Sequence, residues 1–158
     1  MRTHIIHGDF NLLDANSLRW RRLPDILESN PAVLVVDVDS VFNGPIEIGD
    51  EWDAGIFFRN EIFTWLKTLM AVSYFTDRAM ALAVELRDEI EKSLASGKYK
   101  FMREQEILWK IHGRHKNLKI KRLGKELMTW DGTPAPIWTA KGSAKRSDWF
   151  AQRQAEFT

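Results

Sequence analysis

The chain contains no cysteine and no long apolar run. Without cysteine, the sequence excludes a disulfide-stapled scaffold, a thiolate metal site and a cysteine nucleophile. No apolar stretch approaches the roughly 20 residues that a membrane-spanning helix needs, and the first residues contain no hydrophobic signal region. We therefore expect a cytoplasmic protein without a membrane span.

Three common catalytic motifs are also missing: a Gly-rich phosphate loop, G-x-S-x-G and H-E-x-x-H. The composition that remains, 44% hydrophobic and 28% charged among 158 residues, is typical of a globular protein. A chain of this length buries roughly 70% of its unfolded surface, which is enough for a core. Because the sequence has no internal repeat and no low-complexity linker, we expect residues 1–158 to form one domain.

Charge is distributed unevenly along the chain. Residues 110–146 carry ten basic and two acidic side chains, whereas residues 1–109 carry 12 basic and 18 acidic ones. Such a basic segment is consistent with a solvated surface or with binding to an anion. Trp109, Trp130 and Trp138 lie in or beside it and offer rings on which bases stack, so a non-catalytic anion- or nucleic-acid-binding module is one alternative. The net charge of only +1 argues against nucleic acid as the partner.

The apolar pattern predicts both strands and helices. Residues 32–36 form a continuous apolar run, which is typical of a central strand covered on both faces. The other expected strands are 4–7, 54–58, 69–75 and 118–120, and the expected helices are 17–28 with a break at Pro24, 77–96 ended by Gly97, 103–112 and 147–156. We therefore expect an α/β fold with a mixed, mostly parallel sheet and helices on both of its faces.

Two acids follow the 32–36 run directly. Asp37 and Asp39 are separated by one residue, at the carboxyl end of a strand, where open α/β sheets bind their ligands. Neighbouring carboxylates raise each other's pKa, and a divalent cation relieves that repulsion. Hard carboxylate oxygens suit Mg²⁺ or Mn²⁺. The pair predicts a metal or phosphate site, and the alternative is a solvated turn.

Residues 33–41 resemble the D-x-D strand of GT-A-fold glycosyltransferases, especially the family-eight-like retaining group. Three further segments are similar to motifs of that group and occur in the same order. They are the arginine-rich segment 18–27, the acid–glutamine pair Glu104-Gln105 at a helix start, and the closing loop 137–145. The resemblance covers residues 17–146 and implies a GT-A-like domain that transfers a sugar from a nucleotide-diphosphate donor.

The resemblance implies roles for individual residues. Asp37 and Asp39 would bind Mn²⁺ or Mg²⁺ and the diphosphate of the donor. Lys145, together with Lys141, would neutralise the leaving nucleoside diphosphate, and Gly142 would let the backbone approach it. A metal ion and a lysine are what such a departure requires, because negative charge builds on the leaving oxygens.

Other positions follow the group's pattern less closely. Glu104 and Gln105 would lie near the sugar as the catalytic pair, and Trp138 would line the sugar or base site. Thr139 occupies the position of the group's metal-binding histidine, and Glu104 replaces an aspartate. Only 36 residues precede Asp37, so most of the usual nucleoside-binding half is expected to be absent. We expect a minimal enzyme, a chain completed by a homodimer or partner, or a non-catalytic relative.

A haloacid-dehalogenase-like phosphohydrolase is a second enzymatic alternative. Residues 37–41 also fit the D-x-D-x-[TV] signature of that family, with Asp37 as the nucleophile and Asp39 as the acid/base. That family completes its Mg²⁺ site with acids that follow a later strand. Asp131 is the one candidate here, which makes this interpretation weaker than the glycosyltransferase one.

Overall fold

The computed structural model describes residues 12–37, 39–59, 67–130, 133–139 and 147–156. The helices are α1 (Leu12–Arg21), α2 (Leu23–Ser29), α3 (Met80–Ala95), α4 (Arg103–His112) and α5 (Asp148–Glu156), with a 3₁₀ turn η1 (Asp77–Ala79) before α3. The strands are β1 (Ala32–Val36), β2 (Ser40–Phe42), β3 (Ala54–Phe58), β4 (Thr68–Thr76), β5 (Ile120–Leu123), β6 (Met128–Thr129) and β7 (Ile137–Thr139). The strand expected over 4–7 lies outside the described residues.

The larger sheet has four strands in the order β1-β4-β3-β5. β4 runs antiparallel to both β1 and β3, and only the β3–β5 pair is parallel. The α/β class is therefore confirmed, but the expectation of a mostly parallel sheet is wrong. The cause is visible in the chain length between β3 and β4: nine residues are too few for a parallel crossover, which takes a dozen or more.

β1 lies at an edge of this sheet in the described chain, not at its centre as its sequence predicts. Its apolar side chains are nevertheless used on both faces. Val33 and Val35 pack against the core beneath the helices, and Leu34 and Val36 pack against the core on the opposite face. A run that is apolar on both faces therefore indicates that other parts of the chain pack on both faces of the strand. It does not show whether the strand lies at the centre or at the edge of the sheet.

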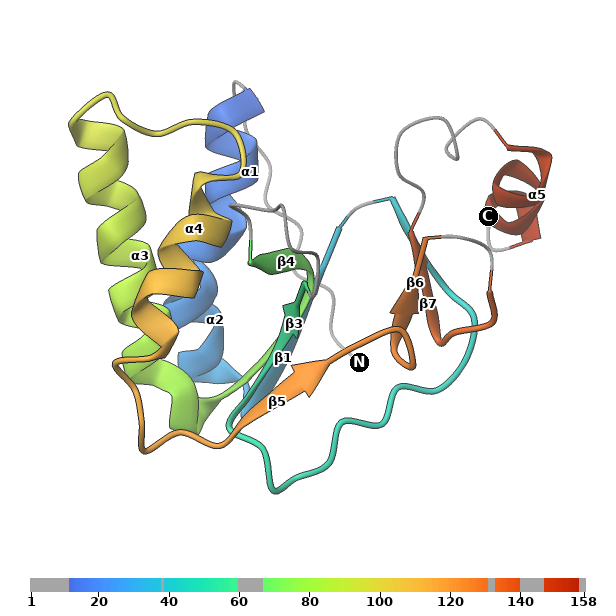
Figure 1. Ribbon diagram of the computed structural model, residues 1–158, viewed down its shortest axis with the longest axis horizontal. Coiled ribbons are helices and arrows are strands. Elements are labelled where there is room, and N and C mark those ends of the chain that lie inside the picture. The colour runs from blue at the N-terminus through green and yellow to red at the C-terminus, as the bar shows by residue number, and fades with distance from the viewer. Residues whose placement is uncertain (1–11, 38, 60–66, 131–132, 140–146, 157–158) are drawn as a thin grey trace.

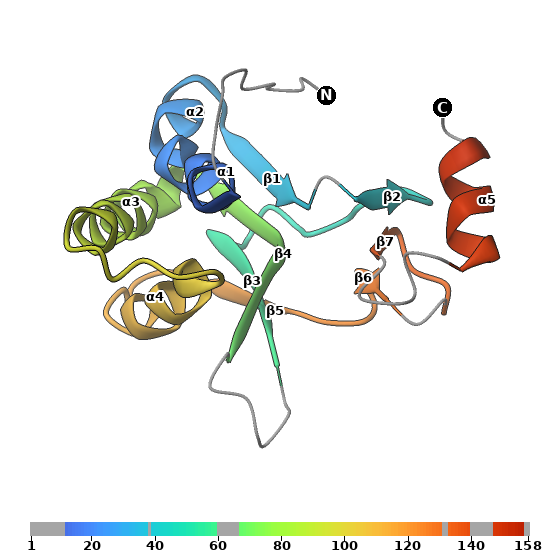
Figure 2. The same ribbon diagram turned by 90° about the horizontal axis from the view of Figure 1, so that it is seen from above.

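Helices α1 to α4 all cover one face of the four-stranded sheet, which corrects the expectation of helices on both faces (Figures 1 and 2). The core beneath them joins Trp20, Leu86 and Leu108 from the helices to Ile56 and Phe75 from the sheet, and all five are almost fully buried. Trp20 meets Phe75 edge-to-face, with 6.4 Å between ring centroids. This core fixes α1 and α4 over the sheet.

A smaller sheet covers the other face. Its order is β2-β7-β6, with β2 antiparallel and β6 parallel to β7. Met128 and Ile137 from this sheet join the second core with Leu123 at the end of β5, and α5 adds Phe150 to a third cluster on its outer side. Figure 1 shows β6, β7 and α5 on the opposite side of the main sheet from α1 to α4. The sequence did not indicate this small sheet.

Most helix boundaries follow the expected signals. The 17–28 region is interrupted at Arg22, and Pro24 lies in the first turn of α2, where its missing N–H costs nothing. α3 ends at Ala95, two residues before the left-handed Gly97, whose φ of 66° favours glycine. α4 and α5 match the predicted 103–112 and 147–156 within a residue. No helix in the described ranges is long and apolar enough to cross a membrane.

Candidate functional site

Asp37 stands where β1 ends and is bound to helix α1. The backbone N–H of Asp37 donates to the carbonyl of Ala71 (2.9 Å), which continues the pairing with β4 by one residue. Arg19 Nη1, in the last turn of α1, lies 2.7 Å from Asp37 Oδ1. Both side chains are about one-quarter exposed, at 27% and 26%. The negative charge of Asp37 is therefore matched by an arginine at the solvent boundary.

Asp39 is held from the opposite side of the main sheet. It directly precedes β2, whose Ser40 is paired with Thr139 in β7. The Thr139 hydroxyl donates to Asp39 Oδ1 over 3.4 Å, a long hydrogen bond. The D-x-D motif, Asp37 to Asp39, thus spans the end of the sheet: its first acid contacts α1, and its second contacts β7.

Glu104 lies in the first turn of α4, and its side chain is buried, with 4% of the residue exposed. Tyr99 donates its hydroxyl proton to Glu104 Oε2 over 2.8 Å. Burial raises the pKa of the Glu104 carboxyl, and the negative charge of Asp37 adds to that rise. The Glu104 backbone N–H, the Tyr99 hydroxyl and the positive charge of Arg19 oppose it without reversing it. Glu104 is therefore electrostatically coupled to both members of the Arg19–Asp37 pair.

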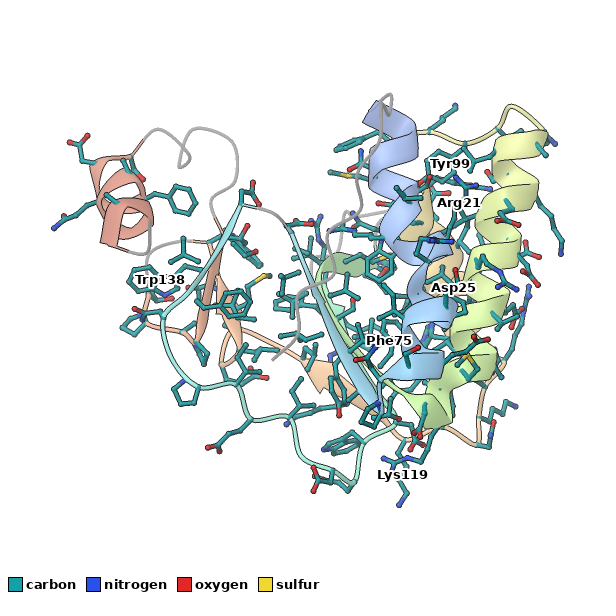
Figure 3. All side chains as sticks on the ribbon, turned by 180° about the vertical axis from the view of Figure 1, so that it is seen from behind. Arg21, Asp25, Phe75, Tyr99, Lys119 and Trp138 are labelled. Atoms are coloured by element: carbon teal, nitrogen blue, oxygen red, sulfur yellow. The ribbon has the colours of Figure 1, made fainter. Side chains whose placement is uncertain are left out.

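Tyr99 is the other half of this buried contact. It is 6% exposed, and desolvation raises the pKa of its phenol well above the ordinary value, with the Glu104 charge as the next cause. The phenol therefore stays protonated and serves as a donor. In Figure 3, Tyr99 is near Arg21 of α1, between the helices and far from Trp138. Tyr99 fixes the orientation of Glu104 beneath the site.

The backbone carbonyl of Gln105 links the start of α4 to the sheet through a hydrogen bond. Thr68, the first residue of β4, donates its hydroxyl to the Gln105 carbonyl over 2.7 Å. Gln105 is 6% exposed, and its side-chain Oε1 has no hydrogen-bond donor within the described chain. A buried acceptor left in this way costs roughly 1–3 kcal/mol. The Gln105 amide is thus a polar group in the interior whose acceptor oxygen is not used by the residues that the structure describes.

Residues from all four segments that resemble glycosyltransferase motifs interact with one of the two D-x-D acids. Arg19, from 18–27, pairs with Asp37, and the buried Glu104, from the acid–glutamine pair, interacts with the same two residues electrostatically. Thr139, from the closing segment, contacts Asp39 from the small sheet.

The remaining predicted site residues have different outcomes. Trp138 is 7% exposed and packs with Val41, Ala135 and Phe150 on the small sheet, and its role at a sugar or base site stays a prediction. The predicted phosphate-loop residues Lys141, Gly142 and Lys145 lie outside the described residues. The chain enters their segment directly after Thr139, which is the residue that contacts Asp39.

The protein ligands available to a metal ion are few. Within the part of the chain that the structure describes, no group of three or more His, Asp or Glu side chains is placed to hold an ion. A divalent cation at Asp37 and Asp39 would therefore depend on those two carboxylates and on oxygens from a substrate and from water. This is a common arrangement for Mg²⁺ beside phosphates.

Sequence reasoning missed the two partners that complete the cluster. Arg19 belongs to the quoted arginine-rich segment, but three arginines stand close together there, and the sequence does not show which one faces Asp37. Tyr99 precedes Glu104 by five residues and lies in no motif. An isolated tyrosine before a helix carries no signal that it will bind a buried carboxyl group.

Comparison with known proteins adds no assignment: no protein-family model matches the chain, and no curated protein matches it.

Proposed function

We propose that the chain is a glycosyltransferase-like enzyme that moves a sugar from a nucleotide-diphosphate donor to an acceptor hydroxyl, with a divalent metal at the D-x-D motif. One observation supports the proposal: the two acids of the D-x-D motif interact with residues of the other three segments, Asp37 with Arg19 and electrostatically with Glu104, and Asp39 with Thr139. Unrelated matches scattered along a chain have no reason to be linked through the same pair of acids.

The donor atoms at this edge fit Mn²⁺ or Mg²⁺. Asp37 and Asp39 offer hard carboxylate oxygens, which suit both ions, and they would hold the ion in this proposal. The ion would supply positive charge to the diphosphate. Arg19 would share the Asp37 carboxylate with the ion or release it, because the guanidinium and the ion attract the same group. Arg19 would then be placed to meet a phosphate oxygen.

In the proposed transfer, the bond between the anomeric carbon and the terminal phosphate oxygen breaks, and its electron pair remains on that oxygen. The acceptor oxygen bonds to the anomeric carbon, and its proton passes to the departing diphosphate oxygen or to water. The departing diphosphate gains negative charge, which basic groups stabilise. Lys141 and Lys145, with Gly142 between them, are proposed for this task because their segment leaves the small sheet beside Asp39.

Glu104 and Gln105 are proposed as the residues that face the sugar side of the site. Their burial and their contacts with Tyr99 and Thr68 give them fixed positions, which supports a role in orientation. The same proposal places the reaction in the cytoplasm. It also retains a homodimer or partner chain beside β1, which is an edge strand among the described residues, because edge strands are commonly covered.

The test measures thermal stabilisation of the full chain by UDP and GDP, with and without Mn²⁺ or Mg²⁺. We expect a diphosphate-dependent rise in Tm that requires the metal and is lost in Asp39→Asn. The matched control is Asp50→Asn, which removes an exposed acid from the 43–53 connection and should leave the rise unchanged. An equal rise in wild type and Asp39→Asn would reject the D-x-D assignment.

The phosphohydrolase alternative is examined in the same assay. Stabilisation by beryllium fluoride with Mg²⁺, and by no nucleoside diphosphate, would favour it. The structure offers it no specific support, because Asp131, its candidate for a further acid, lies outside the described residues.

A further inference from the structure

The turn that follows β2 contains an asparagine directly before a glycine. Asn43, Gly44 and Pro45 are all exposed, and they begin the 43–53 connection, which runs along the outside of the molecule from β2 to β3 (Figure 1). The backbone of Asn43 is held on the small sheet, because its N–H donates to the Pro136 carbonyl over 2.7 Å. Gly44 differs: its N–H has no acceptor among the described residues.

An exposed asparagine can react with the backbone nitrogen of the residue that follows it. That nitrogen attacks the side-chain amide carbon, a new C–N bond forms, and the bond to the side-chain nitrogen breaks. The side-chain nitrogen leaves as ammonia, with the proton that the backbone N–H gives up. Water then opens the cyclic imide, which yields aspartate or isoaspartate. The attack requires an N–H that makes no hydrogen bond, and it is easiest when the following residue is glycine, which has no Cβ in the way.

Two of the other asparagines in the described ranges cannot meet these requirements. Asn30 precedes Pro31, whose backbone nitrogen carries no hydrogen. Asn16 lies inside α1, where the next N–H belongs to the hydrogen-bond pattern of the helix. The residue after it is also fully buried. The backbone at both positions therefore protects the side-chain amide.

Asn117 provides the closest comparison with Asn43, because it is also exposed and lies in a turn. The N–H that follows it is already used: Leu118 donates to the His115 carbonyl over 3.0 Å. Leucine also places a branched side chain beside the attacking nitrogen. Within the part of the chain that the structure describes, Asn43 is thus the asparagine that combines exposure with a following N–H that has no acceptor.

We propose that Asn43 and Gly44 form a site of spontaneous modification, at which the folded chain converts Asn43 into aspartate and isoaspartate with water as the only other reactant. This proposal is independent of the proposed transferase function. One new carboxylate takes the formal net charge from +1 to 0, so ion exchange separates the products. Isoaspartate also inserts a methylene into the backbone at the residue that binds Pro136, and this form should unfold at a lower Tm.

The structure supplies a control variant at position 44. A Cβ placed on Gly44 would meet no heavy atom within 4 Å apart from its chain neighbours, and the φ of this glycine is not positive. Gly44→Ala should therefore fold with the Tm of wild type while its methyl group hinders the attacking nitrogen. Asn43→Gln retains an exposed amide but lengthens the side chain, which disfavours the cyclic imide.

The test stores the full chain at pH 6 and pH 9 and follows each asparagine by peptide mapping with mass spectrometry. We expect Asn43 to convert several-fold faster than Asn117, and faster at pH 9, because base removes the proton of the attacking N–H. Gly44→Ala should slow the conversion several-fold, and Asn43→Gln should remove it. In urea, Asn117 should accelerate more than Asn43, because unfolding releases the Leu118 N–H.

Three results would overturn the proposal. The first is equal conversion of Asn43 and Asn117 in the folded chain. The second is an equal rate in wild type and in Gly44→Ala. The third is conversion of Asn43 only after unfolding in urea, which would show that the fold protects this turn.

Discussion

Arg19 Nη1 lies 2.7 Å from Asp37 Oδ1 and joins the last turn of α1 to the end of β1. The acid proposed to bind a metal ion is therefore already paired with a cation of the chain itself. The same guanidinium interacts electrostatically with the buried Glu104. Arg19 thus belongs to the site as well as to the helix packing, and any ligand of Asp37 has to displace it or share the carboxylate with it.

Replacing Arg19 should change metal binding in a defined direction. Arg19→Gln removes a positive charge that competes with the ion for Asp37, so we expect Mn²⁺ to bind roughly fivefold more tightly, as followed by electron paramagnetic resonance. UDP binding in the presence of Mn²⁺ should weaken, because the variant loses a group placed to meet a phosphate.

Arg22→Gln is the matched control for this experiment. Arg22 is an exposed arginine one turn away, and it pairs with Asp25 rather than with the D-x-D motif. Unchanged Mn²⁺ affinity in Arg19→Gln, or the same increase in both variants, would contradict a metal site at Asp37.

The raised pKa of the Glu104 carboxyl predicts that the stability of the fold depends on pH. Burial raises the pKa of its carboxyl above the ordinary value, so its contribution to stability is complete below the unfolded pKa and is lost as pH rises through the folded pKa. Glu104→Gln stays neutral and can still accept the Tyr99 hydroxyl. We expect the free energy of unfolding of the variant, relative to wild type, to increase between pH 4 and pH 8 in urea titrations.

The control for that series is Glu106→Gln on the same turn, which pairs with Arg103 in wild type. It shows whether removing any acid from the start of α4 has the same effect. A difference between Glu104→Gln and wild type that stays constant across this pH range would show that burial does not penalise the charged carboxyl.

Local signals predicted the helices well. Pro24 and Gly97 mark boundaries through backbone chemistry that acts within a few residues. The layout of the sheet depends on distant partners. The 32–36 run predicted packing on both faces, and residues 33–36 do pack on both faces while being only half-buried, but the edge position of β1 depends on where β4 pairs. The short connection between β3 and β4 did contain the signal for an antiparallel pair, and the expectation of a parallel sheet overlooked it.

The candidate site also combines residues that local motifs indicate with contacts that only the packing of distant segments creates. Asp37, Asp39 and Glu104 were proposed from motif order, which uses residue type and spacing alone. The pairing of Asp37 with Arg19 and of Glu104 with Tyr99 arises from helix packing, so the sequence could not specify it. Trp138 was chosen from its neighbours in sequence, which did not indicate that it packs in a small cluster with Val41, Ala135 and Phe150.

Asp53 is expected to stabilise the fold at neutral pH. Its carboxylate accepts the Lys119 backbone N–H over 2.8 Å and also a hydrogen bond from Arg78 Nε, so it ties together the starts of β3 and β5 and the turn before α3. The hydrogen bond from Lys119 is the largest cause that holds its pKa below the ordinary value, and the Arg78 interactions add to it against burial. This stability is present above the unfolded pKa and is lost as pH falls through the folded pKa.

Asp53→Asn should therefore lower the free energy of unfolding at pH 7 by about 1–3 kcal/mol, and the difference should shrink in acid. Urea titrations at pH 7 and pH 3 measure both effects. Asp50→Asn, three residues earlier and exposed, should change little at either pH. Equal stability of Asp53→Asn and wild type at pH 7 would contradict this prediction. It would show that the rest of the fold holds the contact with Lys119 in place without the Asp53 charge.

Thr139 allows a gain-of-function test of the metal site. Its hydroxyl already reaches Asp39 Oδ1 over 3.4 Å, and it occupies the position where the resembled group has a metal-binding histidine. Thr139→His would add an imidazole beside Asp39. Because imidazole is a softer ligand than carboxylate, we expect metal-induced stabilisation to increase more for Zn²⁺ and Ni²⁺ than for Mg²⁺, as measured by thermal unfolding.

The size of the new side chain needs its own control, because Thr139 is 1% exposed and overpacking costs roughly 1–3 kcal/mol. Thr139→Leu adds comparable bulk without a ligand atom, so both variants should lose stability in the absence of metal. Only Thr139→His should recover it when Zn²⁺ or Ni²⁺ is added, and Asp39→Asn in the same background should cancel that recovery. Identical responses of the histidine and leucine variants would show that the contact between Asp39 and Thr139 belongs to the small sheet and not to a metal site.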